Sequence, residues 1–311
     1  MRVFVAGASG AIGRRLVPQL LDRGHEVVGS TRSEEKAQEL RDLGAEPVML
    51  DLLDEQAVHT AFADNRPDAV VHEATALSGT IDYRHFDRGF AQTNRLRTAG
   101  TNALLAAARA VGARRFVAQS FTSWPYARVG GPVKSEEDPL DPDPPAEIRE
   151  TLAAIRHLEQ TTVDADGIAL RYGGFYGSPD DAQIEAVRKR RFPIVGSGDG
   201  ITSFVHLEDA AAATVLAVES GKSGIYNVVD DEPARAREWL PVLAAAVGAK
   251  PPRHVPTWLA RRLAGDVVVA MMTEARGASN AKAKRELGWS LRYPSWRQGF
   301  LDAYRVVGAL R

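Results

Sequence analysis

The stretch MRVFVAGASGAIGRRLVPQLLDRG, residues 1–24, decides the fold. An apolar strand candidate at 2–6 is followed by three glycines, Gly7, Gly10 and Gly13, and then by an amphipathic stretch that Gly24 ends. Glycine permits a tight turn, lets an anionic group approach the backbone, and lets the helix pack closely on the strand. The pattern predicts a strand–turn–helix unit that binds a dinucleotide phosphate at the N-terminus of its helix.

The same alternation continues along the chain. Further strand candidates, separated by helical stretches, lie at 25–30, 45–50, 68–74, 114–120 and 167–173. Strand–helix–strand units at this spacing have right-handed crossovers, so we predict an α/β fold with a doubly wound parallel sheet of the Rossmann type and helices on both faces. After residue 177 the pattern loosens into turns, short strands and helical stretches at 234–247 and roughly 256–287. We expect a nucleotide-binding domain over 1–175 and a smaller C-terminal substrate lobe over 176–311, interleaved with the sheet.

Composition narrows the class of partner. The 311 residues are 44% hydrophobic and 25% charged, with a net charge of −1, so there is no basic excess for nucleic acid or an anionic membrane. The absence of cysteine excludes disulfides and thiolate chemistry, and we expect no metal site. The N-terminus lacks the order of a signal peptide, and the apolar run 267–272 is too short to span a bilayer. A cytoplasmic monomer or homodimer with a small-molecule substrate is expected.

The end of the second strand predicts the cofactor. An NAD enzyme usually places a carboxylate about 20 residues after the glycines to hold the ribose hydroxyls. This chain has Thr31, Arg32 and Ser33 there instead. A guanidinium can bind a 2′-phosphate with two hydrogen bonds, and a serine hydroxyl can add a third. Arg14 and Arg15 lie within reach in sequence, although solvated helix surface is the better interpretation for at least one. We therefore predict that domain 1–175 binds NADP(H), with NAD disfavoured.

With these motifs in place, the chain resembles the extended short-chain dehydrogenases/reductases, the NAD-dependent epimerase/dehydratase family, almost from end to end. The segments that carry the resemblance are the glycine motif, Asp51-Leu52, 72–76, Asn94, LRYGGFYGSP (170–179), FVHLEDAAAA (204–213), YNVVDDEP (226–233) and AKAKRELGW (281–289). The resemblance implies that 51–52 touch the adenine and that 72–76 form the apolar segment beside the cofactor ribose. The residues it suggests for the cofactor are Gly7, Ser9, Gly10, Ala11, Ile12, Gly13, Arg32, Ser33, Asp51, Leu52, Glu73, Ala74, Thr75, Asn94, Tyr172, Gly174 and Phe175.

The chain departs from the family at the catalytic helix. Family members carry Tyr-x-x-x-Lys followed four residues later by Glu; alignment on Glu159 puts Thr151 at the tyrosine and Ile155 at the lysine. In the family the tyrosine donates a proton to the alkoxide formed as hydride arrives, and the lysine lowers the pKa of that tyrosine. A threonine hydroxyl is too weak an acid to copy this role, and isoleucine can only pack.

A second departure follows the fifth strand, where the family has a serine or threonine. QSFTSWPY (119–126) puts Phe121 near the expected serine and offers Ser120, Thr122 and Ser123 as hydroxyls. We take Ser120 and Thr122 as the candidate catalytic groups that steady a substrate oxygen, although capping of the strand end is an equally good interpretation. Tyr126 and Tyr172 are nearby phenols, more typical of packing or substrate lining than of catalysis.

Substrate contacts are expected from an aromatic group: Trp124, Tyr126, Phe175 and Tyr176. Such surroundings suit a flat, apolar ligand. Nucleotide-sugar members often carry Arg in a phrase like RDFVHVDD, whereas this chain has ITSFVHLED, with Thr202 and Ser203. The basic run 188–191 could compensate, but such a run is more typical of solvated surface. We therefore expect a less charged substrate than a nucleotide sugar.

Three functions remain open. The first is NADPH-dependent reduction of a ketone on a bulky, aromatic, polyketide-like molecule, with the proton coming from a hydroxyl side chain, water or a substrate phenol. The second is nucleotide-sugar epimerase or dehydratase chemistry, which needs a base that Thr151 and Ile155 do not supply. The third is a non-catalytic NADP-binding sensor. We rank the reductase first because the glycine loop and the C-terminal family segments are complete.

Overall fold

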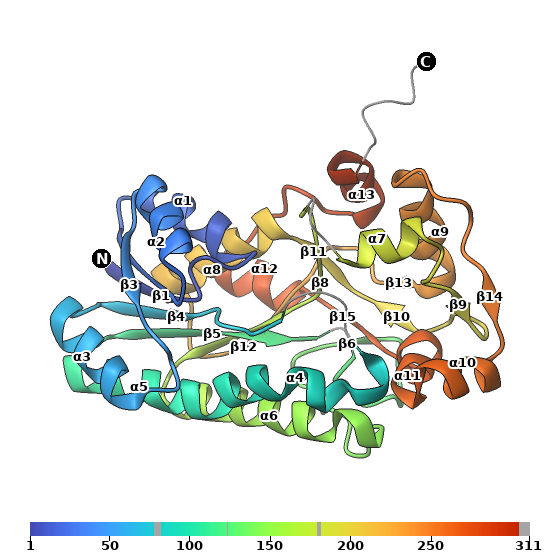
Figure 1. Ribbon diagram of the computed structural model, residues 1–311, viewed down its shortest axis with the longest axis horizontal. Helices are drawn as coiled ribbons and strands as arrows, with labels where there is room; N and C mark the ends of the chain where they lie inside the picture. Colours follow the sequence, from blue (N-terminus) through green and yellow to red (C-terminus); the bar gives the residue numbers. More distant parts are fainter. Residues whose placement is uncertain (78–81, 123, 179–181, 305–311) are drawn as a thin grey trace.

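The computed structural model describes residues 1–77, 82–122, 124–178 and 182–304 (Figure 1). Its main sheet has seven strands in the order β12-β7-β5-β4-β1-β2-β3, and every pairing in it is parallel. The strands are β1 (Arg2–Ala6), β2 (Glu26–Thr31), β3 (Glu46–Met49), β4 (Ala69–His72), β5 (Arg115–Phe121), β7 (Ile168–Tyr172) and β12 (Gly224–Val228). The predicted doubly wound parallel sheet is therefore confirmed.

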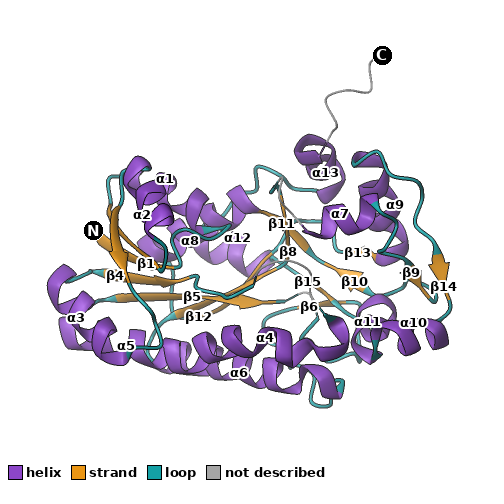
Figure 2. Ribbon diagram, viewed as in Figure 1, coloured by secondary structure: helices purple, strands orange, loops and turns teal. Residues whose placement is uncertain are grey.

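Helices cover both faces of the sheet (Figure 2). One face carries α1 (Gly13–Asp22), α2 (Glu34–Asp42), α8 (Leu207–Ser220) and α12 (Ala281–Leu287). The other carries α3 (Glu55–Asn65), α4 (Phe86–Arg95), α5 (Thr101–Val111) and α6 (Arg149–Asp164). Strands β4 and β7 are buried along their whole length, as expected when helices cover both faces of a parallel sheet. No helix of the described chain is long and apolar enough to cross a membrane.

The C-terminal half contributes to both parts of the molecule. Strand β12 pairs with β7 at one edge of the main sheet, and α8 and α12 pack beside it. The rest forms a smaller lobe around Trp239, Trp296 and Phe300. The remaining described elements, in chain order, are β6 (Val133–Lys134), β8 (Gly174–Tyr176), α7 (Ala182–Arg188), β9 (Ile194–Val195), β10 (Ile201–Thr202), β11 (Phe204–His206), β13 (Ala234–Arg235), α9 (Ala236–Ala246), β14 (His254–Val255), α10 (Thr257–Ala264), α11 (Asp266–Thr273), β15 (Gly277–Ala278) and α13 (Trp296–Tyr304).

The prediction of one continuous helical stretch at 256–287 is wrong. The stretch is divided into α10, α11 and α12, with strand β15 between the last two. Gly265 separates α10 from α11 because its φ of 90° leaves the helical region, which glycine permits. Helix α13 was not predicted.

Helix α6 positions the residues that replace the family's tyrosine and lysine. A short 3₁₀ turn (Ala146–Ile148) follows Pro145, and the helix then runs for 16 residues. Thr151, Ile155 and Glu159 lie on its buried face, as their spacing of four residues predicts. In the figures α4 and α6 run side by side under the sheet.

Candidate active site

The glycine loop between β1 and α1 has no room for side chains. Gly7 has a φ of 87°, and a Cβ there would lie 2.8 Å from the backbone N of Ala74. A Cβ on Gly13 would lie 2.2 Å from the carbonyl oxygen of Ala8. No side chain caps the first turn of α1, so backbone amides at 11–13 are available to an anion. The loop therefore fits the pyrophosphate of a dinucleotide on backbone geometry alone.

The end of β2 lies beside this loop. The Ser9 hydroxyl is 3.5 Å from that of Thr31, and the Gly7 amide donates to Ser30 Oγ at 3.3 Å. The Arg32 side chain is exposed, and no partner for it is found within the described residues. Ser33 precedes α2, and its hydroxyl makes no capping hydrogen bond there. Both groups are therefore free to meet a 2′-phosphate at this point.

The two other arginines near the loop already have partners. Arg14 forms an ion pair with Glu39 at 2.8 Å, and Arg15 approaches Glu208 at 3.7 Å. Their positions match the solvated-surface interpretation better than a role in binding the cofactor. Of the two residues expected to touch the adenine, Asp51 accepts a hydrogen bond from the Leu53 amide at 3.0 Å, and Leu52 is buried.

The end of β4 differs from the apolar segment that was expected. Glu73 is buried and accepts a hydrogen bond from the Tyr172 hydroxyl at 3.0 Å, while its Oε2 has no partner in the part of the chain that the structure describes. Tyr172 also shares a 2.6 Å hydrogen bond with Thr214 of α8. Burial raises the pKa of Glu73 to about 8, with the Tyr172 hydrogen bond opposing it, so this carboxyl is mostly neutral at pH 7. The side chains of Glu73 and Tyr172 are therefore interior, while the backbone at 73–74 touches Gly7; Thr75, next along the chain, is half-buried.

Thr151 cannot act as the missing acid. Its hydroxyl donates to Asp87 Oδ1 at 2.6 Å and accepts a hydrogen bond from Asn94 Nδ2 at 3.0 Å. The side chain is fully buried, and its backbone amide also donates to Asp87. Ile155 is buried as well, so neither position presents a proton donor. Asn94 was predicted to contact the cofactor. Its amide nitrogen donates a hydrogen bond to Thr151, while its Oδ1 has no partner in the described part of the chain.

Ser120, a predicted catalytic residue, lies on β5 and is hydrogen-bonded inside the protein. It is buried, and its hydroxyl donates to Glu159 Oε1 at 2.6 Å. Glu159 is also held by Arg171 in a bidentate ion pair. Arg171 in turn donates to the Tyr126 hydroxyl at 2.9 Å, and Tyr126 donates to Asn227 at 2.7 Å. Both hydroxyls therefore have partners inside the protein, and the roles of Ser120 in catalysis and of Tyr126 in substrate binding stay predictions.

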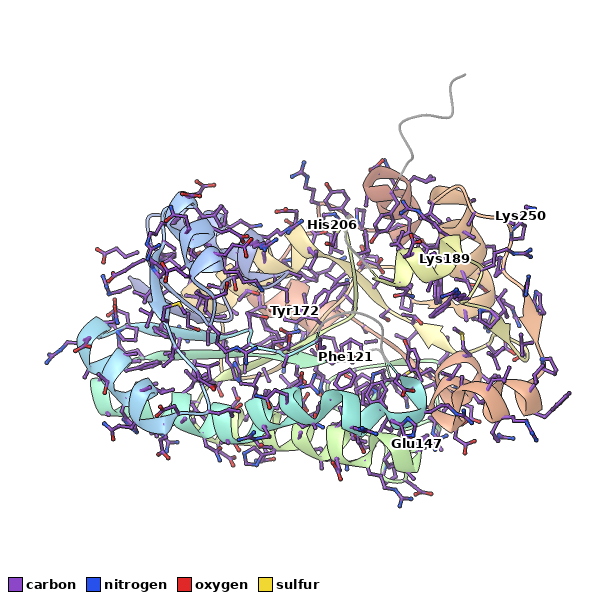
Figure 3. All side chains as sticks on the ribbon, viewed as in Figure 1. Phe121, Glu147, Tyr172, Lys189, His206 and Lys250 are labelled. Carbon is purple, nitrogen blue, oxygen red and sulfur yellow. The ribbon has the colours of Figure 1, made fainter. Side chains whose placement is uncertain are left out.

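Thr122 is the remaining candidate hydroxyl. Its backbone amide donates to the carbonyl of Tyr172 at 3.0 Å, while its Oγ1 is buried without a hydrogen-bond partner among the described residues. Ser123 lies outside the described residues. In Figure 3, Phe121 and Tyr172 mark the region where the main sheet meets the smaller lobe.

The predicted substrate-lining residues divide into two groups. Tyr176 is buried in the smaller lobe, with its ring 5.3 Å from that of Phe300, and its substrate-lining role stays a prediction. Phe175 and Trp124 are half-buried. Trp124 packs edge-on against Phe86, with ring centroids 5.6 Å apart. On β8, a side chain at the Gly174 position would meet the ring of Phe204 at 3.3 Å.

Sequence reasoning missed Arg97. It lies in a π-helical turn (Leu96–Gly100) between α4 and α5, and only 6% of its surface is exposed. Its Nη1 has no hydrogen-bond partner within the described residues. The stretch QTNRLRTAGTNALL (92–105) contains two arginines, Arg95 and Arg97, and the sequence does not distinguish the buried one from the exposed one.

The neighbouring His72 is neutral. Its ring lies 3.2 Å from the carbonyl oxygen of Leu96, and burial lowers its pKa to about 4, with the charge of Arg97 acting in the same direction. The His72 ring therefore adds no positive charge beside Arg97.

Comparisons with known proteins agree with this architecture. The model of the NAD dependent epimerase/dehydratase family matches residues 3–229. A Streptomyces protein named 3-diazoavenalumate denitrifying reductase is 44% identical over 307 residues, covering 96% of this chain and 99% of the relative. A Stigmatella aurantiaca ketoreductase, named for its 4-hydroxy-2-methyl-3-oxo-4-farnesyl-3,4-dihydroquinoline-1-oxide substrate, is 31% identical, covering 99% of this chain and 97% of the relative.

A solved structure has the same fold. UDP-glucose 4-epimerase from Thermus thermophilus, in complex with NAD, superposes with a TM-score of 0.75 at 26% identity, covering 99% of this chain and all of that one. The sheet order, the glycine loop, the family match and the reductase relatives lead to one assignment. The chain belongs to the NAD dependent epimerase/dehydratase family and is an NAD(P)-dependent oxidoreductase with an atypical active site.

Proposed function

We propose that this protein is an NADPH-dependent reductase that removes dinitrogen from an aromatic diazo compound. The observation that carries the proposal is the state of Thr151, whose hydroxyl is already donated to Asp87 at the position of the family's acid. The relative with 44% identity, named for a diazo substrate, supports the same reaction.

The proposed reduction of a diazo compound needs no proton donor from the protein. Bound NADPH supplies a hydride, that is, a proton with two electrons. When hydride reaches the carbon of an aryl diazonium ion, a C–H bond forms, the C–N bond breaks, and the bonding electrons leave with N₂. Atoms and charge balance without a further proton. A ketone, in contrast, leaves an alkoxide that must be protonated.

NADP is proposed over NAD because of the end of β2. Arg32 is exposed without a partner among the described residues, and Ser33 keeps a free hydroxyl. Together they suit a 2′-phosphate, and no carboxylate stands at 31–33 to hold ribose hydroxyls. The glycine loop, with its uncapped helix N-terminus, suits the pyrophosphate.

Reduction of a ketone next to a phenol remains a second candidate. The ketoreductase relative supports it, and the Thr122 hydroxyl, which has no partner among the described residues, can donate a hydrogen bond to a carbonyl oxygen. The phenol would then protonate the neighbouring alkoxide from within the substrate. Epimerase chemistry has less support, because Thr151 and Ile155 provide no base.

Isotope transfer separates these candidates. The purified protein is incubated with a hydroxybenzenediazonium salt and NADPH deuterated at C4 of the nicotinamide. We expect N₂ release and one deuterium on the ring carbon that carried nitrogen, with no label taken from D₂O. Turnover of hydroxyaryl ketones with no reaction of the diazonium salt would favour the second candidate. Tight NADPH binding with neither reaction would favour a non-catalytic sensor.

A further inference from the structure

Among the described residues, no carboxylate forms an ion pair with Arg97. The carboxylate of Glu159 acts on it, but Glu159 is already engaged by Arg171 through two hydrogen bonds of 2.7 Å each. His72 is neutral because burial lowers its pKa to about 4, and Glu73 is mostly neutral because burial raises its pKa to about 8. Arg97 and Arg171 therefore share the single carboxylate of Glu159 among the described residues, which leaves one buried positive charge in excess.

Such a charge is costly without a partner. Burial lowers the pKa of Arg97 to about 10, and its Nη1 has no hydrogen-bond partner among the described residues. A buried cation normally pairs with a carboxylate or is hydrogen-bonded through all its donors. Residues with this kind of unsatisfied buried polarity are typical of binding sites, where a ligand supplies what the protein omits.

The Arg97 side chain lies beside a buried aromatic cluster. The guanidinium carbon lies 6.0 Å from the centre of the Phe90 ring. Phe90 stacks on Phe86 at 4.2 Å, Phe86 meets Trp124 at 5.6 Å, and Trp124 lies 6.0 Å from Phe121. These rings form a continuous row from the cation to Phe121, which ends β5 at the edge of the sheet where the candidate site lies.

We propose that Arg97 binds the anionic oxygen of a phenolate substrate whose ring lies along the aromatic row. The inference rests on the proposed reductase function only for placing the substrate at this edge of the sheet. The cation comes from the π-helical turn, whereas the family places its lysine on the facing helix, at the position of Ile155. Since the guanidinium has a fork of donors, it can hold an aryl oxygen while it stays hydrogen-bonded.

The test uses 4-nitrophenol as the probe, because its anion and its neutral form absorb differently. The protein saturated with NADP⁺ is titrated with the probe below the pKa of the free phenol. We expect the wild type to bind the probe as its anion. Arg97→Gln should weaken that binding about 10–100-fold, and Arg97→Lys should retain part of it. The matched control is Arg95→Gln, an exposed arginine two residues away, which should bind like the wild type.

Two further measurements separate binding from folding. Calorimetric titration with NADP⁺ should give the same affinity for the wild type and Arg97→Gln. The Tm of ligand-free Arg97→Gln should equal or exceed that of the wild type, because the variant removes an uncompensated buried charge. Three results would overturn the proposal: the wild type binds no probe anion; the wild type and Arg97→Gln bind the probe equally; or Arg97→Gln loses affinity for NADP⁺ while its binding of the probe stays intact. Because the probe is not turned over, failure of the diazo reaction would leave this result intact.

Discussion

Glu159 and Arg171 form a buried ion pair in which each carboxylate oxygen is 2.7 Å from a guanidinium nitrogen. The pair joins α6 to β7, and Ser120 of β5 donates to the same carboxylate. The network thus holds the helix that carries Thr151 and Ile155 against two strands of the sheet.

We predict that Glu159→Gln lowers the free energy of unfolding by about 3–5 kcal/mol, because Arg171 is left as a buried charge without its partner. Urea denaturation measures the loss. The double variant Glu159→Leu with Arg171→Met should lose less than the single one, since Arg171 no longer remains as a buried charge without its partner. Glu185→Gln, which breaks an exposed pair with Lys189, is the control and should change stability by less than about 1 kcal/mol. Equal losses in the buried and exposed variants would contradict the prediction.

Arg32→Ala should weaken NADPH binding by about 10–100-fold, the range for loss of a charge-assisted hydrogen-bond pair. NADH, which lacks the 2′-phosphate, should bind the variant and the wild type equally. Fluorescence titration with both cofactors gives the two affinities. Arg14→Ala provides the comparison, because Arg14 is engaged by Glu39. A larger effect of Arg14→Ala on NADPH would transfer the phosphate contact to that residue.

Introducing the family's pair, Thr151→Tyr with Ile155→Lys, should leave the rate of hydride transfer to a diazonium substrate without gain, because that reaction needs no proton. Both positions are buried, so overpacking should also cost about 1–3 kcal/mol of stability. Rates are therefore compared per folded molecule, with folding followed by circular dichroism. A large gain in rate with ketones would show instead that the site still accepts the family's acid.

Glu73 makes stability depend on pH. Burial raises its pKa to about 8 from the ordinary value of 4.5. Between these pH values the folded state holds a proton that the unfolded state has released, so the free energy of unfolding falls as pH rises through this window. Glu73→Gln, which cannot ionise, should gain stability relative to the wild type between pH 5 and pH 8.5, on the order of a few kcal/mol. Thermal melts at both pH values measure the difference, and a constant gap would argue against a neutral Glu73.

Much of the fold could be predicted because its signals are local. The run 1–24 contains its own strand, turn and helix, and each later repeat predicts another parallel strand. The break at Gly265 was missed because apolar periodicity continues on both sides of it. A single glycine that takes a positive φ is not distinguished in sequence from one that a helix tolerates.

The candidate site was less predictable because its partners are distant in sequence. Ser120 was predicted to face the substrate, yet its acceptor, Glu159, lies 39 residues further along the chain. Tyr126 likewise donates to Asn227, 101 residues away. Arg97 was not predicted as a site residue. What marks it is burial without a counter-charge among the described residues, and this depends on packing rather than on any sequence motif.

The position of β12 has a consequence for synthesis. This strand, 224–228, completes one edge of a sheet whose first strand is 2–6, so the sheet stays open until most of the chain has left the ribosome. Until then the backbone of β7 presents unpaired amides and carbonyls, which is the state in which nascent chains associate wrongly. A fragment ending at residue 175 would keep that edge exposed permanently. The nascent protein should therefore depend on chaperones during the interval between the synthesis of β7 and that of β12.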